Sequence, residues 1–273
     1  MNTVTSPSLR MPTWYIPHGG GPCFFMEYSP PDTWDRMADY LKSQAATLPA
    51  KPRGIVMVSA HWLESDVGVM NGVRPELLFD YYGFPPHTYE LTYPAPGSPE
   101  LAARVETLLA QAGQASHPNP NRGFDHGMFI PMMLMFPAAD IPVVQVSLLK
   151  SLDPAAHLQL GRSLASLRDE GILIIGSGMS FHNMRGYRDP RFGPISDAFD
   201  DWLTQAMASP VPERNQALID WAQAPMARWC HPPRAEEHLL PLMVVAGAAG
   251  QDLGRKVFTD RVLETRVSGF NFG

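Results

Sequence analysis

Gly54-Ile55-Val56-Met57-Val58-Ser59-Ala60 is a continuous apolar run rich in β-branched residues, and it decides the fold. Such a run is typical of a strand that is buried on both faces of a sheet. Two further runs of this kind, Pro142 to Leu148 and Ile172 to Ile175, follow along the chain with helical patterns between them. Alternating strands and helices predict an α/β fold, with one three-layer α/β/α domain over residues 1–273 around a mostly parallel, mixed sheet.

Helical spacing of apolar residues and proline or glycine boundaries define the remaining elements. Helices are expected at Asp32 to Leu48, Pro99 to Ala112, Phe129 to Phe136, Asp153 to about Arg168, 195–208, 213–222 and about Glu237 to Ala249. Val67 to Val73 predicts another strand, and Val257 to Phe272 predicts one or two more. Residues 74–98 form a long loop rich in aromatic residues and proline, a kind of loop that often binds or covers a ligand.

Composition and charge exclude several classes of protein. The net charge of −6 gives no electrostatic footprint for nucleic acid or for an anionic membrane surface. No run of about 18 apolar residues predicts a membrane span, and residues 1–11, which we expect to be flexible, lack the pattern of a secretion signal. Cys23 and Cys230 are isolated, as expected in a reducing compartment, so we predict a cytoplasmic protein.

The turn Pro17-His18-Gly19-Gly20-Gly21-Pro22 cannot continue a helix or a strand, because three glycines in a row disfavour both. A backbone of this kind turns sharply or lets a ligand approach. In open α/β sheets, ligands bind at the carboxyl ends of the strands. His18, His61 and His182 each lie at or just beyond such an end, so the three segments predict a site at one edge of the sheet.

Two more histidines have surroundings that indicate chemistry. His126 lies in an Asp-His-Gly turn, and His238 lies near the start of the last helix, since Pro241 is tolerated only in a first turn. Three imidazoles can hold a metal ion with open coordination positions, and further histidines can move protons near neutral pH. Taken singly, each is more often a hydrogen-bonded structural residue, and no two share a short metal-binding spacing.

The other histidines are predicted to have no part in the chemistry. His87 lies in the proline-rich loop, His117 in an Asn-Pro loop, and His157 on an exposed helix turn. His231 precedes two prolines and is expected to be structural.

The five histidine motifs, in their order along the chain, resemble those of the class III extradiol ring-cleaving dioxygenases, in particular the DOPA 4,5-dioxygenase-like branch. The motifs are Pro-His-Gly-Gly-Gly-Pro at His18, Ser-Ala-His-Trp at His61, Asp-His-Gly at His126, Gly-Ser-Gly-Met-Ser-Phe-His-Asn at His182 and Glu-Glu-His-Leu-Leu-Pro-Leu at His238. Tyr82 to Pro86 and Tyr93 to Gly97 match the same branch, and the resemblance spans about residues 12–250.

The resemblance implies an oxidoreductase that opens the ring of a catechol-type substrate with both atoms of O2 at a non-haem Fe(II) site. It implies that His18, His61 and His238 are the metal ligands. His182 falls at the position of the family's base, close enough to touch the metal when substrate is absent, and His126 falls where a second histidine contacts the substrate. Three histidines also suit Zn(II), which a purified protein could carry.

Substrate contacts are less strongly indicated. Tyr82 and Phe84 of the aromatic loop are predicted to pack on the substrate ring, although such residues can also fill a small core of their own. Arg185 is predicted to bind a substrate carboxylate, with Arg122 and Arg234 as further candidates. A catechol and O2 are the expected partners, without nucleic acid or membrane; the pattern names neither the catechol, nor the cleaved bond, nor the oligomeric state.

Two alternative functions fit the same residues. Three histidines with an open metal position could activate water in a zinc hydrolase. The scaffold could also serve a binding protein without catalytic activity, although retention of all five histidines argues for an enzyme.

Overall fold

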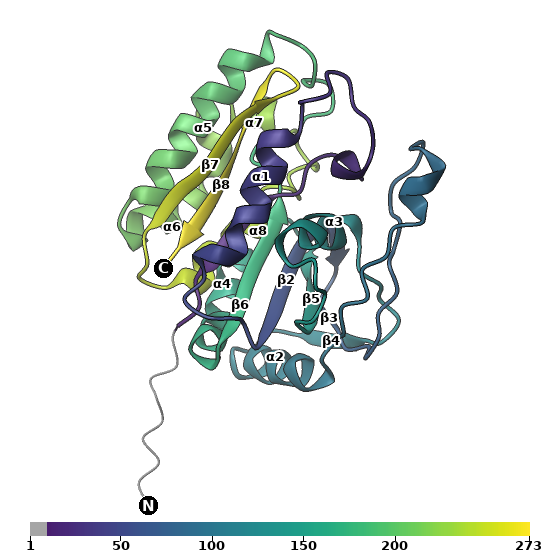
Figure 1. Cartoon of the computed structure of the whole chain (residues 1–273). Coiled ribbons are helices and arrows are strands. Elements are labelled where there is room, and N and C mark those ends of the chain that lie inside the picture. The colour runs from purple at the N-terminus through teal and green to yellow at the C-terminus, as the bar shows by residue number, and fades with distance from the viewer. Residues whose placement is uncertain (1–9) are drawn as a thin grey trace, which may run out of the picture.

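The computed structural model describes residues 10–273, and its centre is one eight-stranded mixed sheet (Figure 1). The strands are β1 Thr13–Pro17, β2 Gly54–Glu64, β3 Val67–Met70, β4 Ser116–Asn119, β5 Val143–Leu149, β6 Ile172–Gly178, β7 Gly254–Val262 and β8 Thr265–Phe272. Their order is β4-β3-β5-β2-β6-β1-β8-β7. The four central strands β5, β2, β6 and β1 are parallel, whereas β8 and β7 form an antiparallel hairpin at one edge. The predicted mostly parallel, mixed sheet is confirmed.

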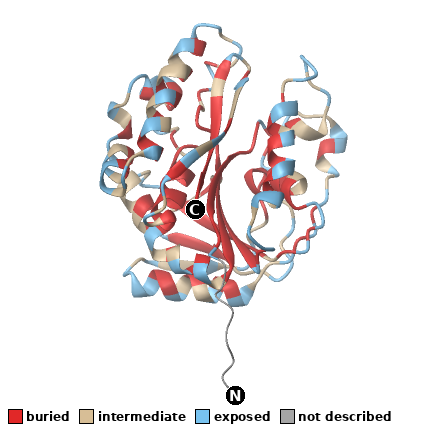
Figure 2. Ribbon diagram, turned by 60° about the vertical axis from the view of Figure 1, so that its left-hand side comes forward, coloured by how far each residue is buried: buried red, intermediate tan, exposed pale blue. Residues whose placement is uncertain are grey.

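Helices cover both faces of this sheet. They are α1 Asp35–Gln44, α2 Pro99–Gln111, α3 His126–Met135, α4 Pro154–Leu164, α5 Phe192–Ala208, α6 Val211–Ile219, α7 Ala227–Cys230 and α8 Leu240–Ala249. Helices α1 and α3 pack on one face, and α4, α5 and α8 pack on the other. Figure 2 shows the buried strands between two layers whose outer helix faces are exposed, which confirms the three-layer α/β/α prediction.

Several local predictions need correction. His117 lies in the short edge strand β4 instead of a loop; Pro118, which cannot donate a hydrogen bond, is tolerated there because the strand is at the edge of the sheet. His157 is fully buried instead of exposed, because α4 packs against the sheet at β5; its Nδ1 lies 2.7 Å from the Asp153 carbonyl and its Nε2 accepts the Leu149 N–H at 3.0 Å. It therefore fastens the start of α4 to the end of β5.

The N-terminal segment that was expected to be flexible is described only from residue 10 onward, and residues 1–9 lie outside the described residues. Met11 is buried, and its backbone is held at both sides by Arg168. The Met11 N–H donates to the Arg168 carbonyl at 3.0 Å, and Arg168 Nε donates to the Met11 carbonyl at 2.6 Å. Met11 is therefore a packed part of the fold.

Helices α4 and α8 approach each other closely, and this contact holds α8 against the sheet. A Cβ atom at Gly161 would lie 1.9 Å from the Val244 carbonyl oxygen, and one at Gly247 would lie 2.2 Å from the Leu158 carbonyl oxygen. Neither position has room for a side chain. The contact matters for function because His238 lies immediately before α8.

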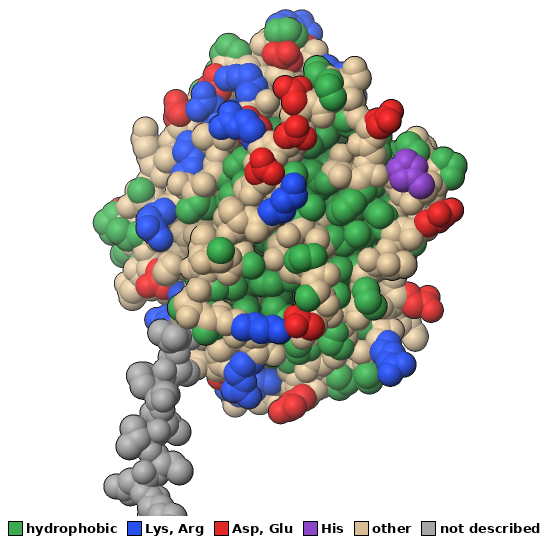
Figure 3. Space-filling view, viewed as in Figure 1, with side chains coloured by type: hydrophobic (Ala, Val, Ile, Leu, Met, Phe, Trp, Pro, Cys, Tyr) green, Lys and Arg blue, Asp and Glu red, His purple; other side chains and the backbone are tan. Residues whose placement is uncertain are grey.

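The surface gives a mixed picture of charge. On the face seen in Figure 3, hydrophobic side chains gather in the middle, and charged side chains of both signs lie above and below them and around the rim. Within residues 10–273, no helix is both long enough and apolar enough to cross a membrane.

His231 is a buried histidine outside the site residues predicted from the sequence. Its Nε2 lies 2.9 Å from the Ser180 carbonyl oxygen, and its side chain is fully buried. Burial, with smaller contributions from neighbouring groups, lowers the pKa of His231 to about 3. The folded protein therefore keeps this ring uncharged well below the pH at which an unfolded chain would protonate it.

The α4–α8 contact predicts the effect of one added methyl group. Gly247→Ala should lower the free energy of unfolding by about 1–3 kcal/mol, because the backbone of the facing helix must move. Urea denaturation measures the change. Gly193→Ala in α5 is the matched control, since its Cβ would first meet the movable end of Arg261 at 3.1 Å. Equal stability of the Gly247→Ala variant and the natural protein would contradict the close contact.

The lowered pKa of His231 predicts a pH-dependent loss of stability. Between about pH 6.5 and pH 3, the unfolded state binds a proton that the folded state does not, so stability falls as pH falls. His231→Asn removes this group, so the stability of the natural protein relative to the variant should fall by about 1.2 kcal/mol in total between pH 7.0 and pH 5.5, approaching about 1.4 kcal/mol per pH unit at lower pH. Denaturation at pH 7.0, 6.0 and 5.5 tests this; a difference that stays constant with pH would refute it.

Candidate metal centre and active site

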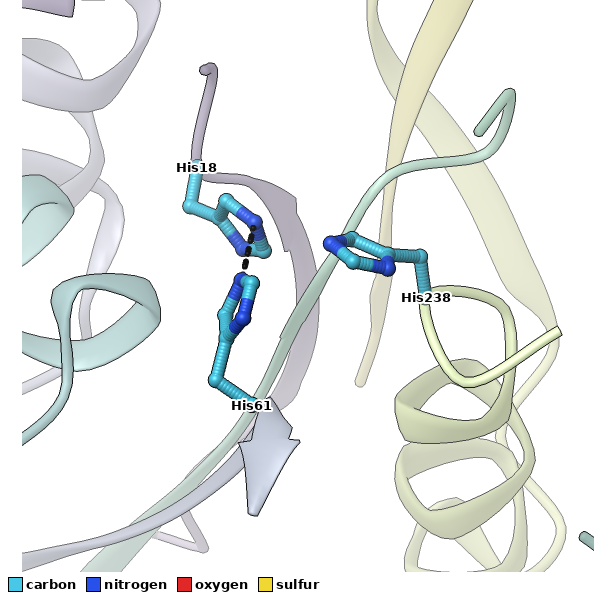
Figure 4. Close-up of side chains that lie close together, drawn as sticks. All are labelled: His18, His61 and His238. Carbon is cyan, nitrogen blue, oxygen red and sulfur yellow. Dashed lines mark hydrogen bonds between the residues drawn. The ribbon is translucent and has the colours of Figure 1, made fainter. Parts of the chain in front are cut away.

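Three histidine rings from distant parts of the chain converge at one point (Figure 4). One ligand nitrogen from each of His18, His61 and His238 lies within 4.8 Å of the other two. The Nε2 atoms of His18 and His61 are 3.2 Å apart. These three residues are the ones predicted to hold a metal, and a single ion placed between them would be within reach of all three.

Backbone contacts at the ends of the parallel strands bring two of these rings together. His18 follows β1, and its N–H donates to the Gly178 carbonyl at 3.2 Å, which extends the pairing of β1 with β6. His61 lies inside β2, where the register with β5 shifts between Val58 and Leu63. Such an irregularity re-aims a side chain relative to a regular strand.

The third ring, that of His238, lies in the segment that leads into α8. The His238 carbonyl accepts hydrogen bonds from the Tyr15 hydroxyl at 2.8 Å and from the Met179 N–H at 3.1 Å. Tyr15 belongs to β1 and Met179 follows β6, so the same two strand ends that carry His18 also fix the backbone of His238.

Burial keeps the three rings uncharged. Burial first, and the nearby histidines second, lower the pKa of His18 and of His238 well below the usual value. The same causes lower the pKa of His61 to about 3, although the charge of Asp80 acts in the opposite direction. Uncharged imidazoles offer a lone pair at neutral pH, which is the form that binds a metal ion.

Two further histidines flank the three. The His182 ring stacks on the His238 ring with centroids 3.4 Å apart and an angle of 13° between the planes. The His126 ring lies beside the His61 ring with centroids 3.9 Å apart. Burial, and secondarily the nearness of His126, lower the pKa of His182 to about 4. All five predicted histidines therefore come together.

Two carboxylates that the sequence interpretation did not single out lie behind the rings. Asp80 Oδ1 accepts from His126 Nδ1 at 2.8 Å, and Asp80 Oδ2 lies 3.7 Å from His61 Nδ1. Glu237 Oε1 lies 3.1 Å from His238 Nδ1 and 3.8 Å from His182 Nδ1. Metal-binding histidines commonly donate their second ring N–H to a carboxylate, so this donor set fits a bound metal ion.

The sequence contains a signal for one of these two carboxylates and none for the other. Glu237 is the sequence neighbour of His238, and that adjacency was an available signal. Asp80 is separated from His126 by 46 positions and lies in the aromatic loop, so no local pattern connects the two residues.

A buried polar network holds the irregular part of β2 next to His61. Asp125 is fully buried, caps α3 by accepting the Met128 N–H at 3.2 Å, and also accepts a hydrogen bond from the Ser59 hydroxyl at 2.6 Å. Ser59 Oγ in turn accepts the His61 N–H at 3.2 Å. Arg122 donates to Asp125 at 2.7 Å, so its guanidinium belongs to this network instead of reaching a substrate carboxylate.

A cavity of about 280 Å³ opens onto the five histidines and the glycine turn. Phe84 lines it, and a Cβ atom at Gly21 would lie 2.8 Å from the Phe84 ring, so the glycine leaves room for that aromatic wall. Tyr82 is 92% exposed and Arg185 is also exposed, and neither is among the described residues that line the cavity. Their assignment to substrate binding stays a prediction.

The chain matches known proteins over nearly its whole length. Residues 12–272 match the model of the catalytic LigB subunit of aromatic ring-opening dioxygenase. A 4,5-DOPA dioxygenase extradiol from Beta vulgaris is 43% identical over 206 residues, which are 74% of this chain and 75% of the relative. The protein of that name from Escherichia coli K12 is 35% identical over 90% of this chain and 88% of its own. Dioxygenase tasH of Hapsidospora irregularis is 40% identical over 82% of this chain and 72% of its own.

A solved structure supports the same relationship. The crystal structure of an uncharacterized protein from Escherichia coli K12 matches with a TM-score of 0.76 and 32% identity, over 97% of this chain and 100% of that one. The family match confirms the resemblance seen in the histidine motifs and favours an oxidoreductase over a zinc hydrolase. The chain belongs to the class III extradiol dioxygenases of the LigB family, enzymes that open aromatic rings with O2.

Proposed function

We propose that this chain opens the ring of a catechol-type substrate with O2 at a non-haem Fe(II) ion held by His18, His61 and His238. The observation that carries the proposal is the convergence within 4.8 Å of three uncharged imidazoles, two buried and His61 half-buried, at a cavity that also holds His182 and His126. Family membership supports the reaction type.

Hydrogen bonds determine which nitrogen of His18 is available to a metal. The Ser177 hydroxyl donates its one hydrogen to the Gly127 carbonyl. It must therefore accept from His18, whose Nδ1 lies 2.9 Å from Ser177 Oγ. Nδ1 then carries the ring proton, and the lone pair is on Nε2, the atom that faces His61. Glu237 acts on His238 Nδ1 in the same way.

Iron is the metal that we propose for activity. Three histidines also suit Zn(II), which has no redox chemistry, so zinc-loaded protein would be inactive. When bound, Fe(II) would acidify the catechol hydroxyls and provide an electron path from the substrate to O2.

His182 is proposed as the base that accepts a catechol proton. Its ring is uncharged at neutral pH because its pKa is lowered to about 4, and it lies against His238, next to the proposed metal position. Its Nδ1 is 3.8 Å from Glu237, too long for a hydrogen bond, so the ring is not committed to that carboxylate. The proton it takes can be returned as the ring opens.

His126 is proposed to contact the substrate. Its Nδ1 and its backbone N–H both lie within hydrogen-bond distance of Asp80, at 2.8 and 3.0 Å, which fixes the ring and leaves Nε2 for the substrate. Phe84 is proposed to pack on the substrate ring, because it lines the same cavity.

We also infer a reducing, cytoplasmic environment. Cys23 and Cys230 are both unpaired and buried, as expected where disulfides do not form.

Replacing the base should separate metal binding from turnover. His182→Ala should retain its iron but lose about 10²–10⁴-fold in turnover, because the proton acceptor is missing. Oxygen uptake with catechol and iron content by atomic absorption measure the two effects. His117→Ala in edge strand β4 is the control and should keep full turnover. Unchanged turnover in His182→Ala would sink the base assignment, and loss of iron would make His182 a ligand.

Removing the hydroxyl that sets the tautomer of His18 should weaken the metal site. Ser177→Ala should reduce metal affinity about 10–100-fold, because the acceptor for His18 Nδ1–H is lost. Competition with a chromophoric chelator measures affinity for Fe(II) or Zn(II) without any turnover. Ser163→Ala on α4, whose hydroxyl bonds only its own helix at Gln159, is the control. Equal affinity in both variants would argue against His18 as a ligand.

A further inference from the structure

The part of the cavity away from the histidines has an apolar lining. Its walls include Tyr28, Trp34, Phe84, Met184, Tyr187 and Leu263. Among the described residues that line the cavity, none is Lys, Arg, Asp or Glu. A substituent on the substrate ring that enters this region would therefore find no counter-ion.

The charges nearest to the histidines are negative. Asp80 and Glu237 lie behind the rings as hydrogen-bond acceptors. A carboxylate on the substrate would add a third negative charge to a buried site, which is unfavourable without a paired cation.

Of the arginines near the cavity, Arg188 already contacts other groups of the protein, and Arg185 does not line the cavity. The Arg188 guanidinium lies over the Tyr28 ring, 5.5 Å from its centroid, and donates to the Ser29 carbonyl at 3.3 Å. Arg185 is exposed and does not line the cavity. Neither supplies a positive charge inside the apolar region.

Leu263 separates this apolar region from a charged groove on the outside. It lines the cavity and also a neighbouring groove that contains Arg36, Arg188, Asp260 and Arg261. Its side chain therefore stands between the substrate cavity and the charges of that groove.

The backbone at Leu263 is in a conformation that leucine rarely adopts. Leu263 and Glu264 form the two-residue turn between β7 and β8, with φ of 48° and 73°. Turns of this kind favour Asn and Gly, because both residues need positive φ. The Arg188 N–H holds the strained turn by donating to the Leu263 carbonyl at 2.8 Å. A strained, bulky residue on a cavity wall indicates a use for its side chain.

One polar group among these walls has no partner. The buried indole N–H of Trp34 makes no hydrogen bond within residues 10–273. Because this nitrogen is itself buried, it presents no polar surface to the cavity, and the wall at Trp34 is apolar.

From this lining we propose that the substrate is a catechol whose ring substituent is uncharged and largely apolar, and that Leu263 is a specificity-determining residue for it. The proposal rests on the ring-opening function argued above.

A matched pair of substrates tests the preference. 3,4-Dihydroxyphenylacetate and its methyl ester differ in charge at nearly equal size, and catechol itself is the reference. In oxygen-uptake assays with Fe(II)-loaded protein, kcat/KM should be at least about tenfold higher for the ester than for the acid. Calorimetric titration of zinc-loaded protein should give the same order of affinities in the absence of turnover.

Two substitutions at the hairpin test the role of Leu263. Leu263→Lys places a cation on the wall and should shift the ester-to-acid ratio at least about tenfold towards the acid. Leu263→Asn suits the turn, so the melting temperature should hold or rise while KM for the ester increases. Leu253→Lys is the matched control at a 51% exposed leucine outside the cavity, and its ratio should equal that of the natural protein.

The outcomes distinguish failure of the proposed ring-opening function from failure of the proposed substrate preference. No oxygen uptake with any of the three catechols would overturn the proposed function, and the calorimetric order would then still decide the charge preference. Turnover of catechol with the acid equal to or better than the ester would overturn the inference alone. Loss of acid binding in Arg185→Ala would likewise overturn it in favour of a carboxylate contact at Arg185, whereas an unchanged ratio would support it.

Discussion

The convergence within 4.8 Å of the imidazoles of His18, His61 and His238, two buried and one half-buried, is the constraint on which the rest of this structure depends. Without a metal ion, the Nε2 atoms of His18 and His61, 3.2 Å apart, form a hydrogen bond in which the uncharged His61 ring donates to the lone pair of His18. Burial lowers the pKa of His18, His61 and His238, so each ring is uncharged at neutral pH and has one lone pair that a metal ion could use. The metal ion that we propose would take the place of that hydrogen bond and be held by all three rings.

Backbone groups at the ends of the parallel strands hold these rings in place. Strands β1 and β6 end side by side, and the groups at their ends hold His18 through the Gly178 carbonyl and His238 through Tyr15 and Met179. The irregular register of β2 turns His61 towards the same point. Helix α8 is held in place by its close contact with α4, so a contact far from the metal position also fixes the third ring.

The sequence predicted what periodicity and recurring motifs encode. The apolar run at Ile55 to Val58 is a buried central strand, and the five histidine motifs mark residues that do meet. It could not predict contacts made by tertiary packing alone. Asp80 meets His126 across 46 positions, His157 is buried only because α4 packs on the sheet, and Leu263 reaches the cavity only because the β7–β8 hairpin folds over it. No local pattern of residues contains that information.

The same physical property governs both halves of the cavity. Burial lowers the pKa of His18, His61, His182 and His238, and the carboxylates of Asp80 and Glu237 accept hydrogen bonds from ring N–H groups at the same site. A site of this kind already holds as much negative charge as its cations can balance. An anionic substituent on the substrate would compete with Asp80 and Glu237 for the same few donors. An apolar wall at Leu263 would avoid that competition, so the metal binding and the substrate preference that we propose have the same physical basis in charge and burial.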